Sequence, residues 1–163
     1  MPIYTCTTVD SALTADVKAT LAGEISRIHS EINHVPSTYV NVVFPGLPAD
    51  SVYTDGVPAS PLLISGWVRS GHPEADTTRL ATEIAATATR VTGIPADRVL
   101  VVFQSSPAHF AVEGGRVLPA PGEERAWMEA VAEERERAKS RGEMRRVARR
   151  HARSREGRAT RSG

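Results

Sequence analysis

The sequence predicts an α+β fold in which two β-α-β units form one four-stranded sheet with two helices on one face. A strand, helix, strand pattern spans residues 3–44 and returns in residues 62–104. Within each unit the crossover helix makes the two strands parallel. Both helices show one apolar face, which is expected to pack on the sheet. The opposite face of the sheet would stay open and apolar, so we expect partner subunits to bury it.

The first unit begins directly after Pro2. Residues 3–9 are rich in β-branched side chains and predict a strand. Thr14 is a suitable N-cap for a helix over about residues 14–33. The apolar positions of this helix recur at spacings of three and four: Leu13, Val17, Leu21, Ile25, Ile28 and Ile32. Residues 39–44 then predict the second strand, which a turn-rich stretch follows.

The second unit repeats this order about sixty residues later. Residues 62–69 predict a strand and residues 74–92 a helix. The apolar face of this helix holds Leu80, Ile84, Ala88 and Val91. The segment Gly93-Ile94-Pro95 is a stop signal, and residues 98–104 predict the last strand.

The segment after the second unit predicts a loop and then a charged helix. Residues 105–122 are rich in proline and glycine, and a loop of this length can fold back over a site. Residues 123–138 have a charged helical pattern. After about Gly142 arginine dominates with almost no apolar periodicity, so we expect disorder or a solvated helix there.

The chain has 163 residues, which suits one domain with a real core. It contains no run of about 18 apolar residues. Its N-terminus lacks a basic segment followed by an apolar one. We therefore expect neither a membrane span nor a signal peptide, and a cytoplasmic location. The single cysteine, Cys6, cannot form an internal disulfide, and its place in the first strand favours a core residue over a nucleophile.

The net charge of +1 hides a division between the two parts of the chain. Residues 1–122 hold seven basic and eleven acidic residues, whereas residues 123–163 hold thirteen and eight. Nine arginines and two glutamates lie in residues 141–163. A nucleic-acid or acidic partner would therefore contact the tail, which could equally be a solubilising segment. The tail has no interleaved aromatic residues, so sequence-specific nucleic-acid recognition is not predicted.

The first two residues, Met1 and Pro2, offer one reactive group. A small second residue permits removal of the initiator methionine, which would leave Pro2 with a free secondary amine. A free α-amine has a pKa of about 8, and burial or nearby cations lower it toward the range of a general base. The same dipeptide is also common in processed tails that have no catalytic role.

The proline that opens a strand, the doubled layout and the segment Glu-Gly-Gly-Arg-Val-Leu-Pro-Ala-Pro-Gly of residues 113–122 resemble the tautomerase superfamily. More narrowly, the chain resembles the cis-3-chloroacrylic acid dehalogenase branch, whose members are fused β-α-β pairs. The resemblance covers residues 2–128 and implies a tautomerase/MIF-like domain that assembles as a homotrimer and needs no cofactor. Residues 129–163, a charged helical segment and an arginine-rich tail, lie outside it.

The resemblance also implies which residues form the site. The family's amino-terminal proline corresponds to Pro2, its helix histidine to His29, its first arginine to Arg69 and its loop glutamate to Glu113. The position of its second arginine holds His72. The position of its tyrosine holds Val102 in place of a phenol.

These two departures decide which reaction we expect. Replacing an arginine by His72 removes at least one charge-assisted hydrogen bond to a substrate carboxylate, worth about 1.5–3 kcal/mol. Val102 has no phenol to position water. Proton transfer needs less, so the resemblance implies a cofactor-independent tautomerase of 2-keto or 2-hydroxy unsaturated carboxylates. A slow cis-3-haloacrylate dehalogenase or hydratase and a non-catalytic oligomeric module with a basic tail are the alternatives.

In the expected tautomerase, Pro2 is the general base and Arg69 binds the substrate carboxylate and lowers the pKa of the amine. His29 hydrogen-bonds the substrate, and Glu113 orients water or takes a proton. His72 is a weak replacement cation, charged near or below about pH 6.5. Each residue except Pro2 also has a purely structural interpretation: a surface arginine, a packed histidine, a solvated carboxylate and a loop end. His34, His109 and His151 have no metal-ligand spacing, so no metal site is predicted.

Overall fold

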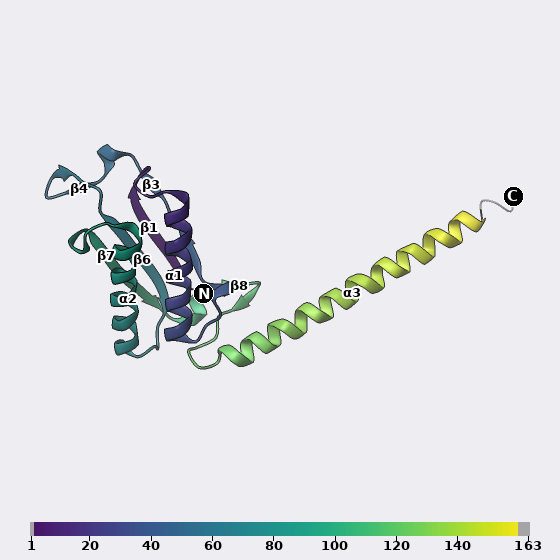
Figure 1. Ribbon diagram of the computed structural model, residues 1–163. Coiled ribbons are helices and arrows are strands. Elements are labelled where there is room, and N and C mark those ends of the chain that lie inside the picture. Colours follow the sequence, from purple (N-terminus) through teal and green to yellow (C-terminus); the bar gives the residue numbers. More distant parts are fainter. Residues whose placement is uncertain (1, 160–163) are drawn as a thin grey trace. The chain divides into compact units, whose positions relative to one another are not determined.

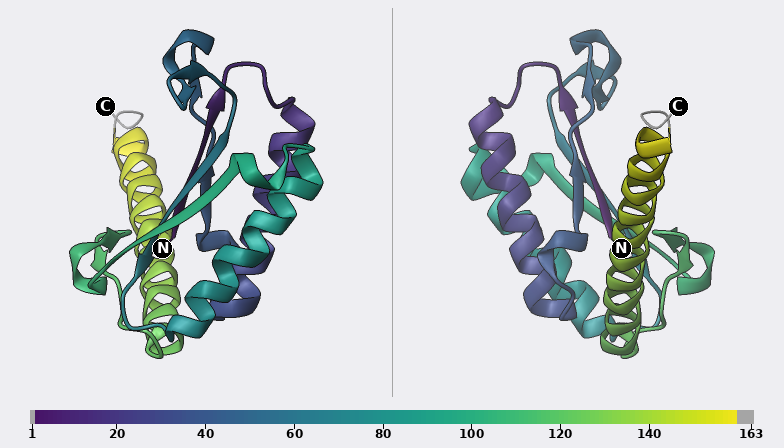
Figure 2. Two further views of the ribbon diagram at one scale, coloured as in Figure 1. Left: turned by 90° about the vertical axis from the view of Figure 1, so that its left-hand side faces the viewer. Right: turned by 90° about the vertical axis from the view of Figure 1, so that its right-hand side faces the viewer.

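A mixed sheet with two helices on one face forms the first part of the molecule (Figures 1 and 2). The computed structural model describes residues 2–159, with side chains through residue 144. The chain divides into two units, Met1–Pro121 and Gly122–Gly163, and each is described by itself. The sheet belongs to the first unit.

The order of the strands confirms the predicted pair of β-α-β units. From one edge to the other the main strands are β2 (Asn41–Val43), β1 (Ile3–Val9), β6 (Leu62–Arg69) and β7 (Val99–Ser106). β1 is parallel to β2, and β6 is parallel to β7. The two β-α-β units meet where β1 and β6 run antiparallel. A short fifth strand, β3 (Gly46–Leu47), also pairs with β1.

Two helices of equal length cross the same face of the sheet. They are α1 (Ala15–Asn33) and α2 (Glu74–Thr92), close to the predicted ranges. The hydroxyl of Thr14 accepts a hydrogen bond from the N–H of Val17 at 3.3 Å, as expected of an N-cap. Gly93 ends α2 in the left-handed region with a φ of 74°, which glycine adopts without strain.

The core lies between the helices and one face of the sheet. Side chains along β1 alternate between buried and less buried positions, as expected for a strand covered on one side. The largest fully buried side chains are Tyr4, Leu21, Ile25, Ile28, Leu62, Ile64, Leu80, Ile84 and Cys6. Cys6 is therefore a core residue, as predicted.

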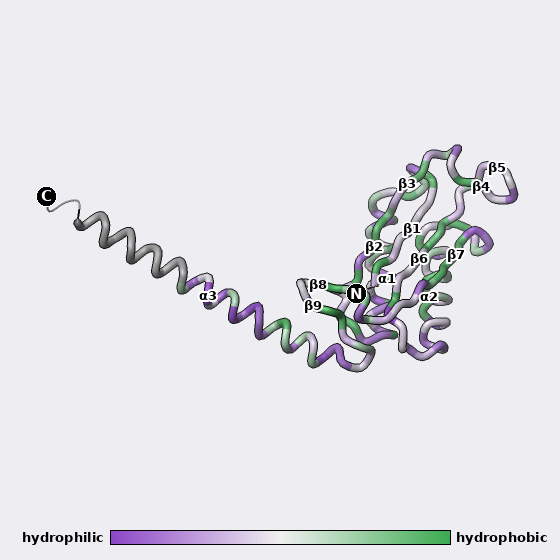
Figure 3. The backbone as a smooth tube through the Cα atoms, turned by 180° about the vertical axis from the view of Figure 1, so that it is seen from behind, coloured by the Kyte–Doolittle hydropathy of each residue, from purple (hydrophilic) through white to green (hydrophobic). Residues whose placement is uncertain are grey.

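The opposite face of the sheet is apolar and exposed in the single chain. Ile3 is 48% exposed, Leu100 is 56% exposed and Val102 is 46% exposed. Both helices lie on the other side of the sheet in Figure 2, and Figure 3 views the molecule from the open side. Such a face matches the expectation that partner subunits bury it.

Two small hairpins occupy the segments that the sequence predicted as turns and loop. They are formed by β4 (Tyr53–Thr54) with β5 (Val57–Pro58), and by β8 (Val112–Glu113) with β9 (Arg116–Val117). A main-chain hydrogen bond of 3.0 Å closes each one, from Ala59 to Val52 and from Leu118 to Ala111. The two hairpins lie 59 residues apart, so they are equivalent parts of the two repeats.

One-turn 3-10 helices also recur at equivalent places in both repeats, each directly after a proline. They are η1 (Ser37–Tyr39), η2 (Ala49–Ser51), η3 (Ala96–Arg98) and η4 (Ala108–Phe110). Each proline is the N-cap, with φ near −55° and ψ between 136° and 146°, a backbone conformation that proline readily adopts. The second strand of the first unit is shorter than predicted, since η1 takes Tyr39.

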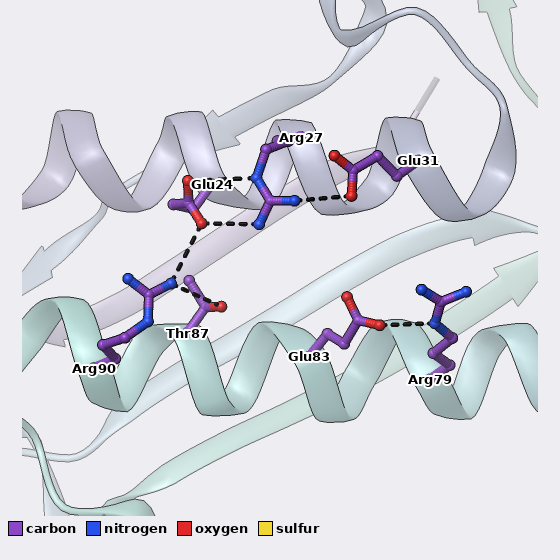
Figure 4. A network of polar contacts seen from close by, with 7 residues as sticks. All are labelled: Glu24, Arg27, Glu31, Arg79, Glu83, Thr87 and Arg90. Atoms are coloured by element: carbon purple, nitrogen blue, oxygen red, sulfur yellow. Dashed lines mark hydrogen bonds and ion pairs between the residues drawn. The ribbon is translucent and has the colours of Figure 1, made fainter.

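Ion pairs join the two helices on their outer surface (Figure 4). The carboxylate of Glu24 lies 3.0 Å from the guanidinium of Arg27 on the same helix and 3.3 Å from that of Arg90 on α2. Exposed pairs of this kind contribute about 0–1 kcal/mol each. The pair between Glu24 and Arg90 joins the two helices but adds little to their stability.

The C-terminal part of the chain, Gly122–Gly163, contains α3 (Glu124–Ala159). This helix has charged side chains where these are described. Ion pairs join Glu133 to Arg137 at 3.2 Å and Glu136 to Lys139 at 2.7 Å. The backbone stays helical past Gly142, and the side chains after residue 144 lie outside the described ones. Within the described part of the chain, no helix is long and apolar enough to cross a membrane.

Candidate active site

The N-terminal end of β1 is held in the middle of the sheet. Pro2 is buried, and its carbonyl accepts a hydrogen bond from the N–H of Asn41 at 3.1 Å. The next residue, Ile3, pairs with Asn41 on one side and with Trp67 of β6 on the other. Neighbouring strands on both sides therefore fix the position of Pro2.

A cavity of about 350 Å³ adjoins this end of β1. Four of its lining residues come from the sheet: Ile3, Asn41, Trp67 and Ser106. The other five come from the segment after β7: Phe110, Ala111, Val112, Glu113 and Leu118. The β8–β9 hairpin lies beside the N-terminus in Figure 1, so the predicted loop does fold back over the start of the chain.

Arg69 ties the segment after β7 to the sheet. It is the last residue of β6, and its Nη1 donates a hydrogen bond of 2.6 Å to the carbonyl of Pro119. Arg69 is only 8% exposed, so it is not a surface arginine at a strand end. It follows Trp67 by two residues, and strand alternation places the two on the same face. Arg69 itself is not among the residues that line the cavity.

His29 lies under the sheet, on the buried face of α1. It is 4% exposed, and its Nδ1 is 2.7 Å from the hydroxyl of Tyr4. Burial, and after it the positive charges of nearby His72 and Arg69, lowers the pKa of His29 to about 3. His29 is therefore neutral at pH 7 and can donate one hydrogen bond. The same interactions make His29, His72 and Arg69 electrostatic neighbours.

Glu113 and His72 lie on separate loops. Glu113 is half-buried in the β8–β9 hairpin, pairs in register with Arg116 and lines the cavity. His72 is half-buried just before Pro73, the N-cap of α2. Of the residues named from the sequence, Glu113 lines the cavity, whereas Pro2, Arg69, His29 and His72 are not among its lining residues. His72 and Arg69 are instead electrostatic neighbours of His29.

Tyr4 is a polar residue at this site that the sequence did not single out. Its ring is fully buried and meets the ring of His29 edge to face, with centroids 5.8 Å apart. Burial, and to a smaller extent Cys6, raises the pKa of Tyr4, so its hydroxyl keeps its proton. Val102, at the family's tyrosine position, lies on the exposed face of the sheet. Strand alternation could have indicated Tyr4, because it lies two residues after Pro2 and therefore on the same, inward face of the strand.

The second repeat builds an equivalent cavity without this chemistry. A space of about 610 Å³ lies between the β4–β5 hairpin and the starts of β6 and β7. Leu63 pairs with Leu100 in β7 as Ile3 pairs with Asn41 in β2. Leu62 therefore occupies the place of Pro2 in the second repeat. The two cavities thus share one architecture, and the cavity of the first repeat is the one that adjoins the start of β1.

No group of three or more histidine, cysteine, aspartate or glutamate side chains that could hold a metal occurs among the described residues. The same residues include the buried guanidinium of Arg69, the neutral imidazole of His29 and the carboxylate of Glu113. Such a set can bind a small acid and move a proton within it.

Comparison with known proteins gives the chain its family. A family model described as putative oxalocrotonate tautomerase enzyme matches residues 1–129. A crystal structure of native Ps01740 is 34% identical, covers 68% of this chain and 99% of its own, and has a TM-score of 0.67. A crystal structure of N1, a member of the cis-3-chloroacrylic acid dehalogenase family, is 25% identical, with coverage of 81% and 96% and a TM-score of 0.76.

A fused 4-OT wild-type asymmetric trimer shares the fold, at 18% identity and a TM-score of 0.65, with coverage of 71% of this chain and 94% of its own. Comparison with curated proteins gave no match.

Proposed function

The chain belongs to the family of putative oxalocrotonate tautomerase enzymes, and we propose that it is a cofactor-independent tautomerase whose general base is the amine of Pro2. The observation that carries this proposal is the buried Pro2 directly before a central strand whose first residue, Ile3, lines the cavity. The mechanism requires removal of Met1, which lies outside the described residues. Burial of Pro2 favours a neutral amine at pH 7. The antiparallel pairing of Ile3 with Trp67 places the end of β6, where Arg69 lies, beside the start of β1, and a cation there favours the neutral amine too.

In the proposed reaction a 2-hydroxy unsaturated acid becomes a 2-keto acid. Pro2 takes the proton of the enol hydroxyl, the oxygen becomes the ketone, and the double bond shifts as carbon receives a proton from the Pro2 ammonium. No atom is gained or lost. Arg69 holds the carboxylate, because its guanidinium stays charged at every physiological pH. Neutral His29 donates a hydrogen bond to the substrate, and Glu113 orients water or takes a proton at the cavity.

The lining of the cavity supports a substrate with one carboxylate and an apolar body. Trp67, Phe110 and Leu118 are among its walls, while Glu113 would repel a second carboxylate. The enol of an arylpyruvate has this chemistry. A second candidate reaction is slow hydration of cis-3-haloacrylates, which the similarity to N1 of the cis-3-chloroacrylic acid dehalogenase family favours. His72 in place of an arginine weighs against efficient dehalogenation.

The open apolar face of the sheet supports assembly as a homotrimer. Exposed Ile3, Leu100 and Val102 lie on this face, and its burial would remove their apolar surface from water. The fused 4-OT structure is described as a trimer. Because Ile3 also lines the cavity, assembly would shape the site as well.

Replacement of Pro2 tests the proposal. We expect Pro2→Ala to lower kcat/KM for enol-phenylpyruvate by about a hundredfold, the lower end of general-base contributions, because the replacement loses the rigid ring and the secondary amine. Pro61→Ala is the matched control, since Pro61 lies in the same cavity architecture of the second repeat. Equal rates for Pro2→Ala and wild type would rule out Pro2 as the base.

A further inference from the structure

The pair formed by Tyr4 and His29 is buried between the sheet and α1. Tyr4 is 0% exposed and His29 is 4% exposed. The hydroxyl oxygen of Tyr4 lies 2.7 Å from Nδ1 of His29, a short hydrogen bond between two side chains 25 residues apart. The side-chain nitrogen Nδ2 of Asn33 lies 3.4 Å from both ring nitrogens of His29, so this contact does not select one of them. The hydroxyl of Tyr4 contacts Nδ1 and therefore distinguishes the two nitrogens.

The direction of this hydrogen bond follows from the donors and acceptors of the phenol and the imidazole. A neutral imidazole has one N–H and one lone pair, whereas a phenol has one proton that needs an acceptor. Among the described residues, His29 is the hydrogen-bond partner of the Tyr4 hydroxyl. If Nδ1 carried the proton, the Tyr4 hydroxyl would be a buried donor without an acceptor, which is costly. Tyr4 therefore donates to Nδ1, and the proton of His29 resides on Nε2.

We propose that Tyr4 is a positioning residue that holds His29 as the Nε2–H tautomer, so that Nε2 donates the hydrogen bond to the substrate. The substrate role of His29 rests on the proposed tautomerase function, whereas the tautomer itself does not. Arg69 then supplies the positive charge of the site and His29 a neutral, oriented donor.

Comparison of the two repeats separates this role from a purely structural one. The helices repeat at 59 residues, so Ala88 occupies the place of His29. The strands β1 and β6 repeat at 60 residues, so Ile64 occupies the place of Tyr4. Ile64 and Ala88 are both buried, and the repeat folds without a polar pair. The pair occurs in the repeat that contains Pro2 and is replaced by apolar residues in the repeat that lacks an amine.

Nitrogen NMR of histidine-labelled wild-type protein tests the tautomer without substrate. We expect the His29 spectrum to show a protonated Nε2 and an unprotonated Nδ1. In Tyr4→Phe the two signals should move toward a mixture of tautomers, whereas the matched control Tyr53→Phe, at a 55% exposed tyrosine, should leave them unchanged. A protonated Nδ1 in the wild type would overturn the proposal, and this result does not depend on whether the variant folds.

Kinetics test the effect of the tautomer on the reaction. Tyr4→Phe should lower kcat for enol-phenylpyruvate by about fivefold to tenfold, the effect of one neutral hydrogen bond, with KM changed less. His29→Gln and the double variant Tyr4→Phe/His29→Gln should then have equal rates, because Tyr4 acts through His29. Additive losses would overturn the proposal. The failure of Pro2 as base would instead appear as an active Pro2→Ala variant with the NMR result intact.

Discussion

The neutral, buried imidazole of His29 makes the folded protein sensitive to acid. Burial, then nearby His72 and Arg69, lowers the pKa of His29 to about 3, whereas a histidine in an unfolded chain has a pKa of about 6.5. Between these values the unfolded chain binds more protons at this residue than the folded one. The free energy of unfolding therefore falls as the pH is lowered. The contribution is complete above about pH 6.5 and is lost progressively toward about pH 3.

The size of this effect follows from the same two pKa values. Each additional proton bound by the unfolded chain changes its relative free energy by about 1.4 kcal/mol per pH unit. Between about pH 7.5 and about pH 5, His29 should therefore cost the wild type about 2 kcal/mol of stability. His29→Gln has no such proton to bind, so its stability should fall by about 2 kcal/mol less over this interval.

Urea unfolding followed by circular dichroism at the two pH values measures this difference. One protein concentration must be kept throughout, because assembly of subunits adds to apparent stability. His109→Gln, at an exposed histidine, is the control and should follow the wild type. If wild type and His29→Gln lose equal free energy between the two pH values, His29 is not held neutral in the folded protein.

Three further changes probe the substrate site, the assembly and the tail. Arg69→Ala should lower kcat/KM for enol-phenylpyruvate by about tenfold to a hundredfold, because one charge-assisted hydrogen bond to the carboxylate is lost. The control Arg98→Ala, at an exposed arginine, should leave kcat/KM unchanged. Unchanged kinetics of Arg69→Ala would exclude carboxylate binding by Arg69. Leu100→Asp should convert a trimer to monomers in light scattering, because burial of a carboxylate is unfavourable, and an unchanged mass would place the interface elsewhere. A chain ending at Gly142 should keep the wild-type kcat/KM and lose salt-dependent binding to DNA; equal binding by both chains would show that the tail makes no such contact.

The long elements of the fold could be predicted because each has an apolar pattern of sufficient length. β1, β6 and α2 have the predicted bounds. β6 and α2 belong to the second β-α-β unit, which is the evidence for the doubled layout. β4, β5, β8 and β9 have two residues each, too few for any periodicity, so the sequence predicted turns and loop there. Glu113 was named within such a loop, but its place on the cavity wall depends on the tertiary fold.

The candidate site was predictable residue by residue but not as a network. The resemblance named His29 and Arg69, and their burial became visible only once β1, β6 and α1 were packed together. Tyr4 was overlooked because the family's tyrosine position led to Val102, far along the chain. Its contact with His29 joins a strand to a helix, which neither strand nor helix periodicity reveals by itself.

Removal of Met1 links the sequence to the proposed chemistry most directly. Protein that retains Met1 has an amide at Pro2 and no basic amine there. Purified methionine aminopeptidase would be added to such protein while intact mass and tautomerase activity are followed together. We expect the rate with enol-phenylpyruvate to rise in proportion to the fraction of chains that begin at Pro2. Full activity in protein whose mass still includes Met1 would contradict the account, as would no activity after complete removal.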